Sequence, residues 1–162
     1  MSYIYKMTVC AIFDIDDTIY PHKTLQVNYN TIQQDYELYQ LLKRIRLPKF
    51  VLTNATYEHA NLIVNKLGIE NRFRKIYSRD TIPFMKPHLE CYKRVESDIS
   101  KMMKTHSNKY IFFDDLLVNL EAAKEREWIT IWINPQYHES YKYPFVDKGY
   151  VDLKTALKEL NF

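Results

Sequence analysis

The feature that most constrains the fold is an alternation of short, continuously apolar runs with longer segments of helical periodicity. The apolar runs are residues 9–13, 50–52, 76–77, 110–113 and 130–133, and the helical patterns are residues 30–45, 56–67, 87–103, 118–126 and 153–160. Runs without a polar face predict strands that are buried on both sides. A strand–helix repeat predicts right-handed crossovers and a mainly parallel sheet with helices on both faces. We therefore expect an α/β, Rossmann-like three-layer α/β/α sandwich with a five-stranded sheet.

Single residues mark the ends of several of these elements. Pro48 follows the first helical pattern, Gly68 stands at the expected C-terminal position of the second, and Pro87 is expected to open the third. Asp152 predicts an N-cap for the last helix. No repeat, low-complexity tract or linker divides the chain, so residues 1–162 are expected to form a single domain.

Composition excludes several kinds of site. Only two glycines occur in 162 residues, so neither a Walker-type loop nor a dinucleotide-binding fingerprint can be formed. The net charge of +3 is mild, and we interpret the basic residues mainly as solvated faces rather than as a polyanion patch. Cys10 and Cys91 are expected to be reduced thiols in the core. No secretory signal or membrane span is visible, which favours a cytoplasmic protein without a membrane partner.

Two of the predicted strands end in acidic residues. These residues are Asp14, Asp16 and Asp17 after the first strand, and Asp114 and Asp115, with Asn119 a helical turn later, after the fourth. Because ligands of such sheets collect at the carboxyl ends of the strands, we expect the side chains to converge there. Their repulsion would raise their pKa values unless a cation neutralised them. An all-oxygen set of this kind suits Mg²⁺.

Two further positions complete the parts of a phosphoryl-transfer site. The second strand ends in Thr53 and Asn54, where a hydroxyl could bond a phosphate oxygen, and Lys86 could supply positive charge. Taken singly, an aspartate after a strand is usually a cap or turn former, Thr53 a cap, and Lys86 part of a surface dipeptide. Their joint occurrence in this order favours the functional interpretation.

These residues resemble the haloacid dehalogenase-like superfamily over nearly the whole chain. The four motifs of that superfamily are matched by Asp14-Ile15-Asp16-Asp17-Thr18, by Thr53, by Lys86 before Pro87, and by Asp114-Asp115 with Asn119. The resemblance implies that Asp14 attacks phosphorus and that Asp16 is the general acid/base. Asp17 lies outside the working positions of the motif, and we expect it to form a turn or cap.

The resemblance also implies the roles of the remaining residues. Mg²⁺ would be held by the Asp14 and Asp115 carboxylates and the Asp16 carbonyl, with Asp114 and Asn119 assisting directly or through water. Thr53 and Lys86 would bind the phosphoryl oxygens, with Asn54 beside them. Dehalogenases of the superfamily lack an acid at the position of Asp16, because halide leaves without a proton. The resemblance therefore favours a phosphatase.

Secondary matches resemble the pyrimidine 5′-nucleotidase branch, which carries a helical cap domain between the first two motifs. They include Ile19-Tyr20-Pro21, His59-Ala60 and Leu67-Gly68-Ile69. We interpret His59 as structural rather than catalytic. Only residues 15–52 separate Asp14 from Thr53, so the cap is expected to be missing, a minimal (C0-type) form.

Three functions remain open at this stage. The first is a Mg²⁺-dependent phosphatase of small molecules, with a nucleotide as one candidate substrate. The second is a capless phosphatase that acts on nucleic-acid ends or phosphoproteins, or that borrows a lid from a neighbouring subunit in a homo-oligomer. The third is a non-catalytic binding module. The aromatic segment 136–145 is interpreted as a packing loop, with stacking on bases as the alternative.

Overall fold

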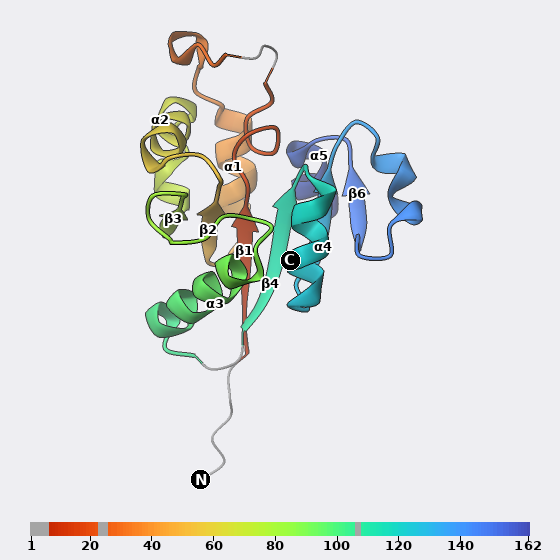
Figure 1. Ribbon diagram of the computed structural model, residues 1–162. Helices are drawn as coiled ribbons and strands as arrows, with labels where there is room; N and C mark the ends of the chain where they lie inside the picture. Colours follow the sequence, from red (N-terminus) through yellow and green to blue (C-terminus); the bar gives the residue numbers. More distant parts are fainter. Residues whose placement is uncertain (1–6, 23–25, 106–107) are drawn as a thin grey trace.

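The computed structural model describes residues 7–22, 26–105 and 108–162, and its centre is a parallel sheet. The strands of the described residues are β1 (Thr8–Phe13), β2 (Lys49–Leu52), β3 (Lys75–Tyr77), β4 (Asn108–Asp114), β5 (Ile129–Ile133) and β6 (Lys148–Tyr150). The α-helices there are α1 (Tyr36–Arg44), α2 (Tyr57–Leu67), α3 (Leu89–Met103), α4 (Leu117–Glu125) and α5 (Leu153–Glu159). Short 3-10 helices are η1 (Tyr29–Thr31), η2 (Glu70–Arg72) and η3 (Tyr137–Lys142). Figure 1 shows their arrangement.

The order of the strands places a topological switch point at the middle of the sheet. The six strands of the described residues lie in the order β3-β2-β1-β4-β5-β6, and all pairs are parallel. The chain moves outward from β1 to β3, returns to β4 beside β1, and then moves outward in the other direction. Ligand sites of such sheets lie at the carboxyl ends of the strands on either side of this point.

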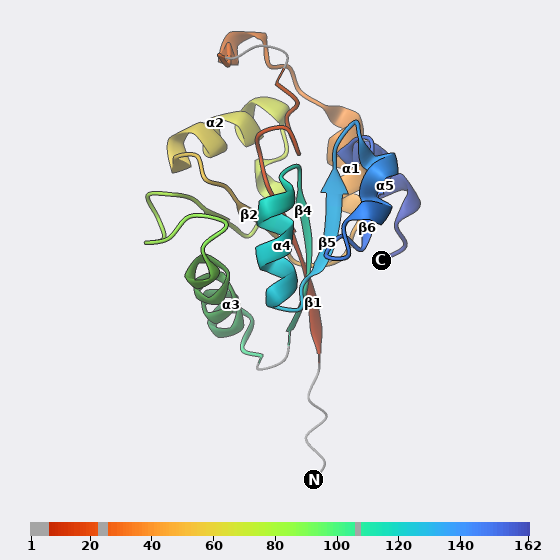
Figure 2. The same cartoon turned by 45° about the vertical axis from the view of Figure 1, so that its right-hand side comes forward.

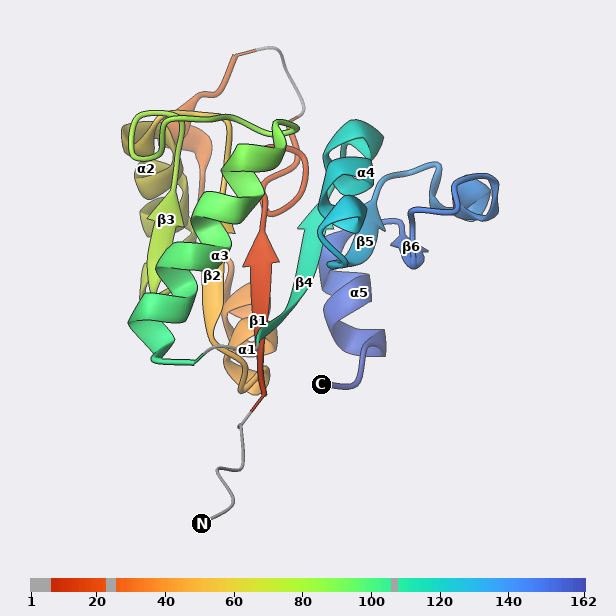
Figure 3. The same ribbon diagram turned by 60° about the horizontal axis from the view of Figure 1, so that its bottom comes forward.

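Helices cover both faces of the sheet, as the sequence predicted. Buried residues of α1, α2 and α5 share one hydrophobic cluster, and those of α3 and α4 share the other (Figure 3). Strand β1 contributes alternately to the two clusters, with Ala11 and Phe13 in the first and Cys10 and Ile12 in the second. All four side chains are fully buried, which explains why this strand has no polar face.

The register of the two central strands decides which residues reach the functional edge together. Phe13 of β1 pairs with Phe113 of β4, and their rings stack with centroids 4.7 Å apart. The backbone N–H of Asp14 then donates to the carbonyl of Phe113 at 3.0 Å. The acidic residues that follow the two strands are therefore brought to the same edge of the sheet.

Three expectations about the elements need correction. The sheet has a sixth strand, β6, which was not predicted because it is three residues long and contains Gly149 instead of an apolar run. Helix α1 begins at Tyr36 rather than near residue 30, because the Asp35 carboxylate caps it by accepting from the N–H of Leu38 at 3.0 Å. Pro87 does not open α3: the chain remains extended at His88, whose ring accepts from the N–H of Glu90.

Other local predictions are confirmed. Gly68 ends α2 in the left-handed conformation with φ of 73°, and Asp152 caps α5 by accepting from the N–H of Thr155 at 2.8 Å. Cys10 and Cys91 are free, buried thiols. In the described part of the chain, no helix has both the length and the apolar character needed to cross a bilayer.

The aromatic segment after β5 packs partly against the core. Tyr143 and Phe145 contact the cluster under α3 and α4, and the ring of Tyr143 meets that of Trp132 edge-on at 5.6 Å. Gly149 is required beside this segment, because a Cβ at that position would lie 2.8 Å from the carbonyl oxygen of Tyr137. Tyr137, His138 and Tyr141 are exposed instead. The packing interpretation therefore holds for Tyr143 and Phe145 but not for the whole segment.

Candidate active site

Strands β1 and β4 bring three carboxylates together at the carboxyl edge of the sheet. One oxygen each of Asp14, Asp114 and Asp115 lies within 4.8 Å of the others. Asp114 is fully buried, Asp14 is nearly so, and Asp115 is half-buried. The indole N–H of Trp132 on β5 donates to the backbone carbonyl of Asp115 at 2.9 Å and fixes that residue from the other side.

Lys86 compensates the charge of this group from within the protein. Its ammonium lies 3.0 Å from Asp14 Oδ1, 2.7 Å from Asp114 Oδ2 and 2.9 Å from the carbonyl oxygen of Leu52. Each of its three N–H donors therefore has an acceptor. Burial by itself would lower the pKa of Lys86, but the carboxylates of Asp114 and Asp14 outweigh that effect and raise it above its usual value. Lys86 thus holds Asp14 in place as a permanent cation.

The two residues after β2 serve different purposes. Thr53 is buried at the edge of the site, and its Oγ1 accepts from the N–H of Ala55 at 3.0 Å, which leaves the hydroxyl proton to donate to a ligand. The Asn54 amide instead holds the backbone of Lys86, accepting from its N–H and donating to its carbonyl, both at 2.9 Å. The amide nitrogen carries two N–H donors and Lys86 engages one of them, so a bond from Asn54 to phosphate could come from the other side-chain N–H or from the backbone N–H.

Asp114 is enclosed by donors from the protein. Besides Lys86, it accepts from the N–H of Leu116 at 2.8 Å, and the Asn119 amide lies 3.1 and 3.2 Å from its two oxygens. Asp14 is less engaged, since Thr18 Oγ1 donates to its Oδ2 at 3.0 Å and Lys86 occupies only Oδ1. Of the predicted metal ligands, Asp14 and Asp115 therefore retain the most capacity for a cation, while Asp114 and Asn119 support the site from behind.

The donor set fits a hard divalent cation. The candidate ligands are carboxylate oxygens, and a carbonyl oxygen of Asp16 or Asn119 could add to them. Burial, together with the neighbouring Asp114, raises the pKa of Asp14 to about 6, although Lys86 partly opposes this. Burial and the charges of Asp114 and Asp14 raise the pKa of Asp115 to about 8. A bound cation would stabilise the ionised forms of these two carboxylates and would lower their pKa values.

Stabilisation by Mg²⁺ should therefore increase with pH. Because the pKa values of Asp14 and Asp115 are raised on folding, the stability that they contribute is complete at low pH and is lost as pH rises through about 6 to 8. Protons and the metal compete for the same oxygens. In EDTA the unfolding temperature should thus fall between about pH 5.5 and about pH 8.5, and millimolar Mg²⁺ should restore most of that loss. Equal Mg²⁺ increments at both pH values would contradict this account.

The acid/base candidate Asp16 is contacted by two histidines. His22 Nε2 lies 2.5 Å and His59 Nε2 2.8 Å from Asp16 Oδ1, and Tyr29 Oη lies 2.5 Å from His59 Nδ1. No periodicity in the sequence singles out His22, and the sequence pattern favours a structural role for His59. The position of His22 shortly after the Asp14–Thr18 stretch is the one feature of the sequence that could have indicated a contact with Asp16.

Asp17 has the turn role that was expected. It adopts a left-handed backbone conformation with φ of 60°, and its carboxylate accepts from the N–H of His22 at 2.8 Å. Its own N–H donates to the carbonyl of Tyr20 at 2.8 Å. This turn directs the chain after β1 back over the carboxyl end of the sheet.

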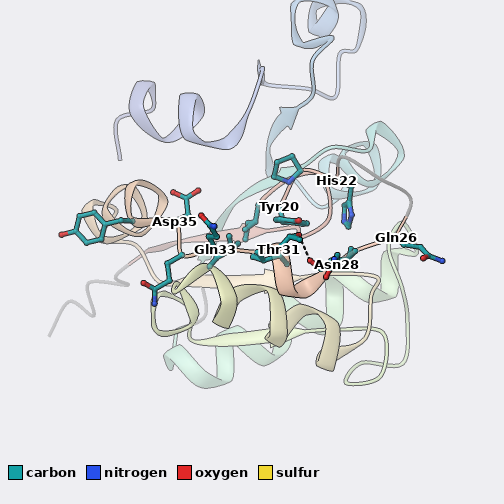
Figure 4. Close-up of a pocket in the computed structure, with 14 residues that line it drawn as sticks. Tyr20, His22, Gln26, Asn28, Thr31, Gln33 and Asp35 are labelled. Carbon is teal, nitrogen blue, oxygen red and sulfur yellow. Dashed lines mark hydrogen bonds between the residues drawn. The ribbon is translucent and has the colours of Figure 1, made fainter.

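The residues between β1 and α1, here called the flap (residues 15–22 and 26–35), rise above the ends of the strands (Figures 1 and 2). A cavity of about 250 Å³ beneath it contains Asp14, Asp16, Thr53, Lys86 and Asp115 among its lining residues. A second cavity of about 740 Å³ lies beneath the flap, and Figure 4 shows that both polar and apolar side chains line it. His22 lines the second cavity and contacts Asp16 in the first, so it connects the two.

Comparison with known proteins identifies the family. The model of the haloacid dehalogenase-like hydrolases matches residues 22–133, which is more than half of the chain. The chain belongs to this family of hydrolases. The match begins after the Asp14–Thr18 stretch, so the first motif is assigned by the position of its residues beside Asp115 and Lys86 rather than by the match itself.

Solved structures of the family share the fold at low identity. The haloacid dehalogenase-like protein SP0104 of Streptococcus pneumoniae is 12% identical with a TM-score of 0.64, over 93% of this chain and 97% of that one. The HAD-hydrolase YfnB of Bacillus subtilis, solved bound to magnesium, is 17% identical with a TM-score of 0.66, over 83% and 59%. L-2-haloacid dehalogenase of Xanthobacter autotrophicus is 14% identical with a TM-score of 0.59, over 80% and 62%.

The chain is shorter than several of these hydrolases. It covers less than two thirds of the dehalogenase and of YfnB, whereas it covers nearly all of SP0104. This small size fits a capless form, and residues 15–52, where the cap was expected to be missing, contain only the flap, α1 and β2 in their described part.

Proposed function

We propose that this hydrolase is a Mg²⁺-dependent phosphatase that forms an aspartyl-phosphate on Asp14. The observation that carries the proposal is the pairing of two carboxylates in different settings. Asp14 is buried and held by Lys86 and Thr18, whereas the Asp16 side chain is 33% exposed at the mouth of the site. A fixed nucleophile beside an accessible proton donor is what phosphomonoester cleavage requires.

The proposed reaction has two steps. A carboxylate oxygen of Asp14 attacks phosphorus, the bond to the leaving oxygen breaks, and Asp16 gives that oxygen a proton. Asp16 then takes a proton from water, which attacks phosphorus and releases inorganic phosphate from Asp14. Mg²⁺ bound at Asp14 and Asp115 would neutralise the crowded carboxylates and the charge of the phosphoryl group. The Thr53 hydroxyl would donate to a phosphoryl oxygen.

The dehalogenases among the structural relatives define the competing reaction. A halide leaves without a proton, so that reaction makes no use of an acid at Asp16. The purified protein should hydrolyse p-nitrophenyl phosphate with Mg²⁺ present, lose that activity in EDTA, and release no chloride from 2-chloropropionate. Release of chloride without release of phosphate from any phosphomonoester would overturn the proposal.

A second candidate substrate class is favoured by the surface around the site. Leu116 lines the catalytic cavity and is 51% exposed, Val118 nearby on α4 is 55% exposed, and Met85 beside Lys86 is 48% exposed. Such an apolar rim suits contact with a macromolecule or with a neighbouring subunit. Rates on nucleoside monophosphates, 3′-phosphorylated oligonucleotides and phosphopeptides should be compared, because a strong preference for mononucleotides would exclude the macromolecular alternative. A specific activity that rises with protein concentration would indicate a lid from a second copy.

A further inference from the structure

The carboxylate of Asp16 is contacted by two histidines, and a tyrosine contacts one of these. His22 comes from the end of the turn that follows β1, His59 from the first turn of α2, and Tyr29 from η1 within the flap. Both ring Nε2 atoms meet the same oxygen, Asp16 Oδ1, at 2.5 and 2.8 Å. Contacts of this kind restrict the rotation of a short side chain that is otherwise open to solvent.

Each histidine is itself held in position. The backbone N–H of His22 donates to Asp17 at 2.8 Å, and its ring lies edge-on to that of Tyr20 at 5.4 Å. The hydroxyl of Tyr29 lies 2.5 Å from His59 Nδ1 and can donate to it. In that arrangement the proton of a neutral His59 is on Nε2 and points at Asp16. The network therefore requires no charged histidine.

We propose that His22 and His59 are positioning residues for Asp16, which fix Oδ1 so that Oδ2 faces the leaving oxygen of a phosphomonoester. The inference rests on the proposed function. Within residues 7–22, 26–105 and 108–162, no hydrogen bond or ion pair reaches Asp16 Oδ2, and this is the oxygen that would exchange the proton. In a capless enzyme the flap and the start of α2 would thus supply the support that the acid needs.

Loss of either imidazole ring should slow the hydrolysis of substrates whose leaving oxygen must be protonated, and should affect other substrates much less. His22→Leu and His59→Leu should lower kcat on phenyl phosphate roughly 10- to 100-fold, since general acid catalysis is typically worth 10²–10⁴-fold. Hydrolysis of 2,4-dinitrophenyl phosphate, whose leaving group is stable as an anion, should change less than about three-fold. His22→Gln and His59→Gln keep an N–H donor near the place of Nε2 and should restore most of the rate on phenyl phosphate.

His138→Leu is the matched control, because His138 is exposed on η3 and should affect neither substrate. Thermal unfolding of each variant shows whether a change in rate reflects loss of folded protein. Equal losses on both phosphate esters, or glutamine variants no better than leucine variants, would overturn the positioning role.

A second measurement separates this inference from the proposed function. If wild-type protein hydrolyses neither ester, the proposed function fails, and the contacts are then tested by ¹⁵N spectra of the histidine rings. Asp16→Asn should shift the ring signals of both His22 and His59, and Tyr29→Phe those of His59. Ring spectra that are unchanged in Asp16→Asn would overturn the inference independently of any activity.

Discussion

Asp14→Asn should reduce phosphomonoester hydrolysis by roughly 10⁴-fold or more, the scale on which loss of a covalent nucleophile is felt. An amide cannot form the acyl-phosphate, and the remaining groups of the site would bind the substrate without cleaving it. The measurement is kcat/KM on phenyl phosphate at saturating Mg²⁺. Asp98→Asn is the control, because Asp98 lies on α3 outside the lining of the catalytic cavity, where it pairs with the half-exposed Lys75 and accepts from the hydroxyl of Tyr77.

The same variant should not be less stable than the wild type above neutral pH. Burial raises the pKa of Asp14 to about 6, so the ionised carboxylate opposes folding at higher pH, and the neutral amide does not carry that penalty. An amide oxygen can still accept from Lys86 or Thr18. Thermal unfolding at about pH 8 in EDTA should therefore show equal or higher stability. If Asp14→Asn still hydrolyses the phosphomonoester, Asp14 is not the nucleophile. If activity is lost only because the variant unfolds, the loss does not support Asp14 as the nucleophile.

Lys86→Met should be the most destabilising single change at the site, at about 3–5 kcal/mol of unfolding free energy. The substitution fits the buried stem but removes a cation that compensates Asp14 and Asp114 at 3.0 and 2.7 Å. Two buried carboxylates then lose the cation that compensates their charge and keep only neutral hydrogen-bond donors. Hydrolysis should be lost as well, because the orientation of Asp14 depends on the same ammonium. Urea unfolding in EDTA measures the effect without compensation by Mg²⁺.

Lys75→Met is the matched control for this prediction. Lys75 forms a half-exposed ion pair with Asp98 at 2.8 Å, and such pairs contribute about 0–1 kcal/mol. Adding Asp114→Asn to Lys86→Met should recover part of the lost stability, because it removes one of the two uncompensated charges. Equal costs for the two lysine variants would contradict the role assigned to Lys86.

Much of the fold follows from local sequence. Five of the six described strands were predicted, and each was signalled by a run of apolar residues. The alternation of these runs with helical patterns determined the parallel sheet, which in turn placed Asp14 and Asp115 at the same edge. Gly68 and Asp152 mark helix ends through backbone and capping chemistry that acts within a few residues.

Elements that depend on distant partners were missed. Strand β6 has one large buried side chain, Tyr150, and exists because β5 pairs with it. The start of α3 was misplaced because His88 rather than Pro87 precedes and caps the helix, while the distant Asn54 amide holds the backbone of Lys86 just before it. Nothing near Pro87 in the sequence records that contact.

The sequence by itself determined five of the six described strands, the end of α2, the start of α5 and the carboxylates that lie at one edge, because strand burial and capping are encoded over a few neighbouring residues. Only the tertiary structure decided that the Lys86 ammonium donates to Asp14, Asp114 and the Leu52 carbonyl. It also decided that His22 and His59 contact Asp16 and that Tyr29 contacts His59. Those contacts join the flap, α2 and the loop before α3. Side-chain geometry across such separations is set by the packing of the whole sheet and leaves no periodic trace in the sequence.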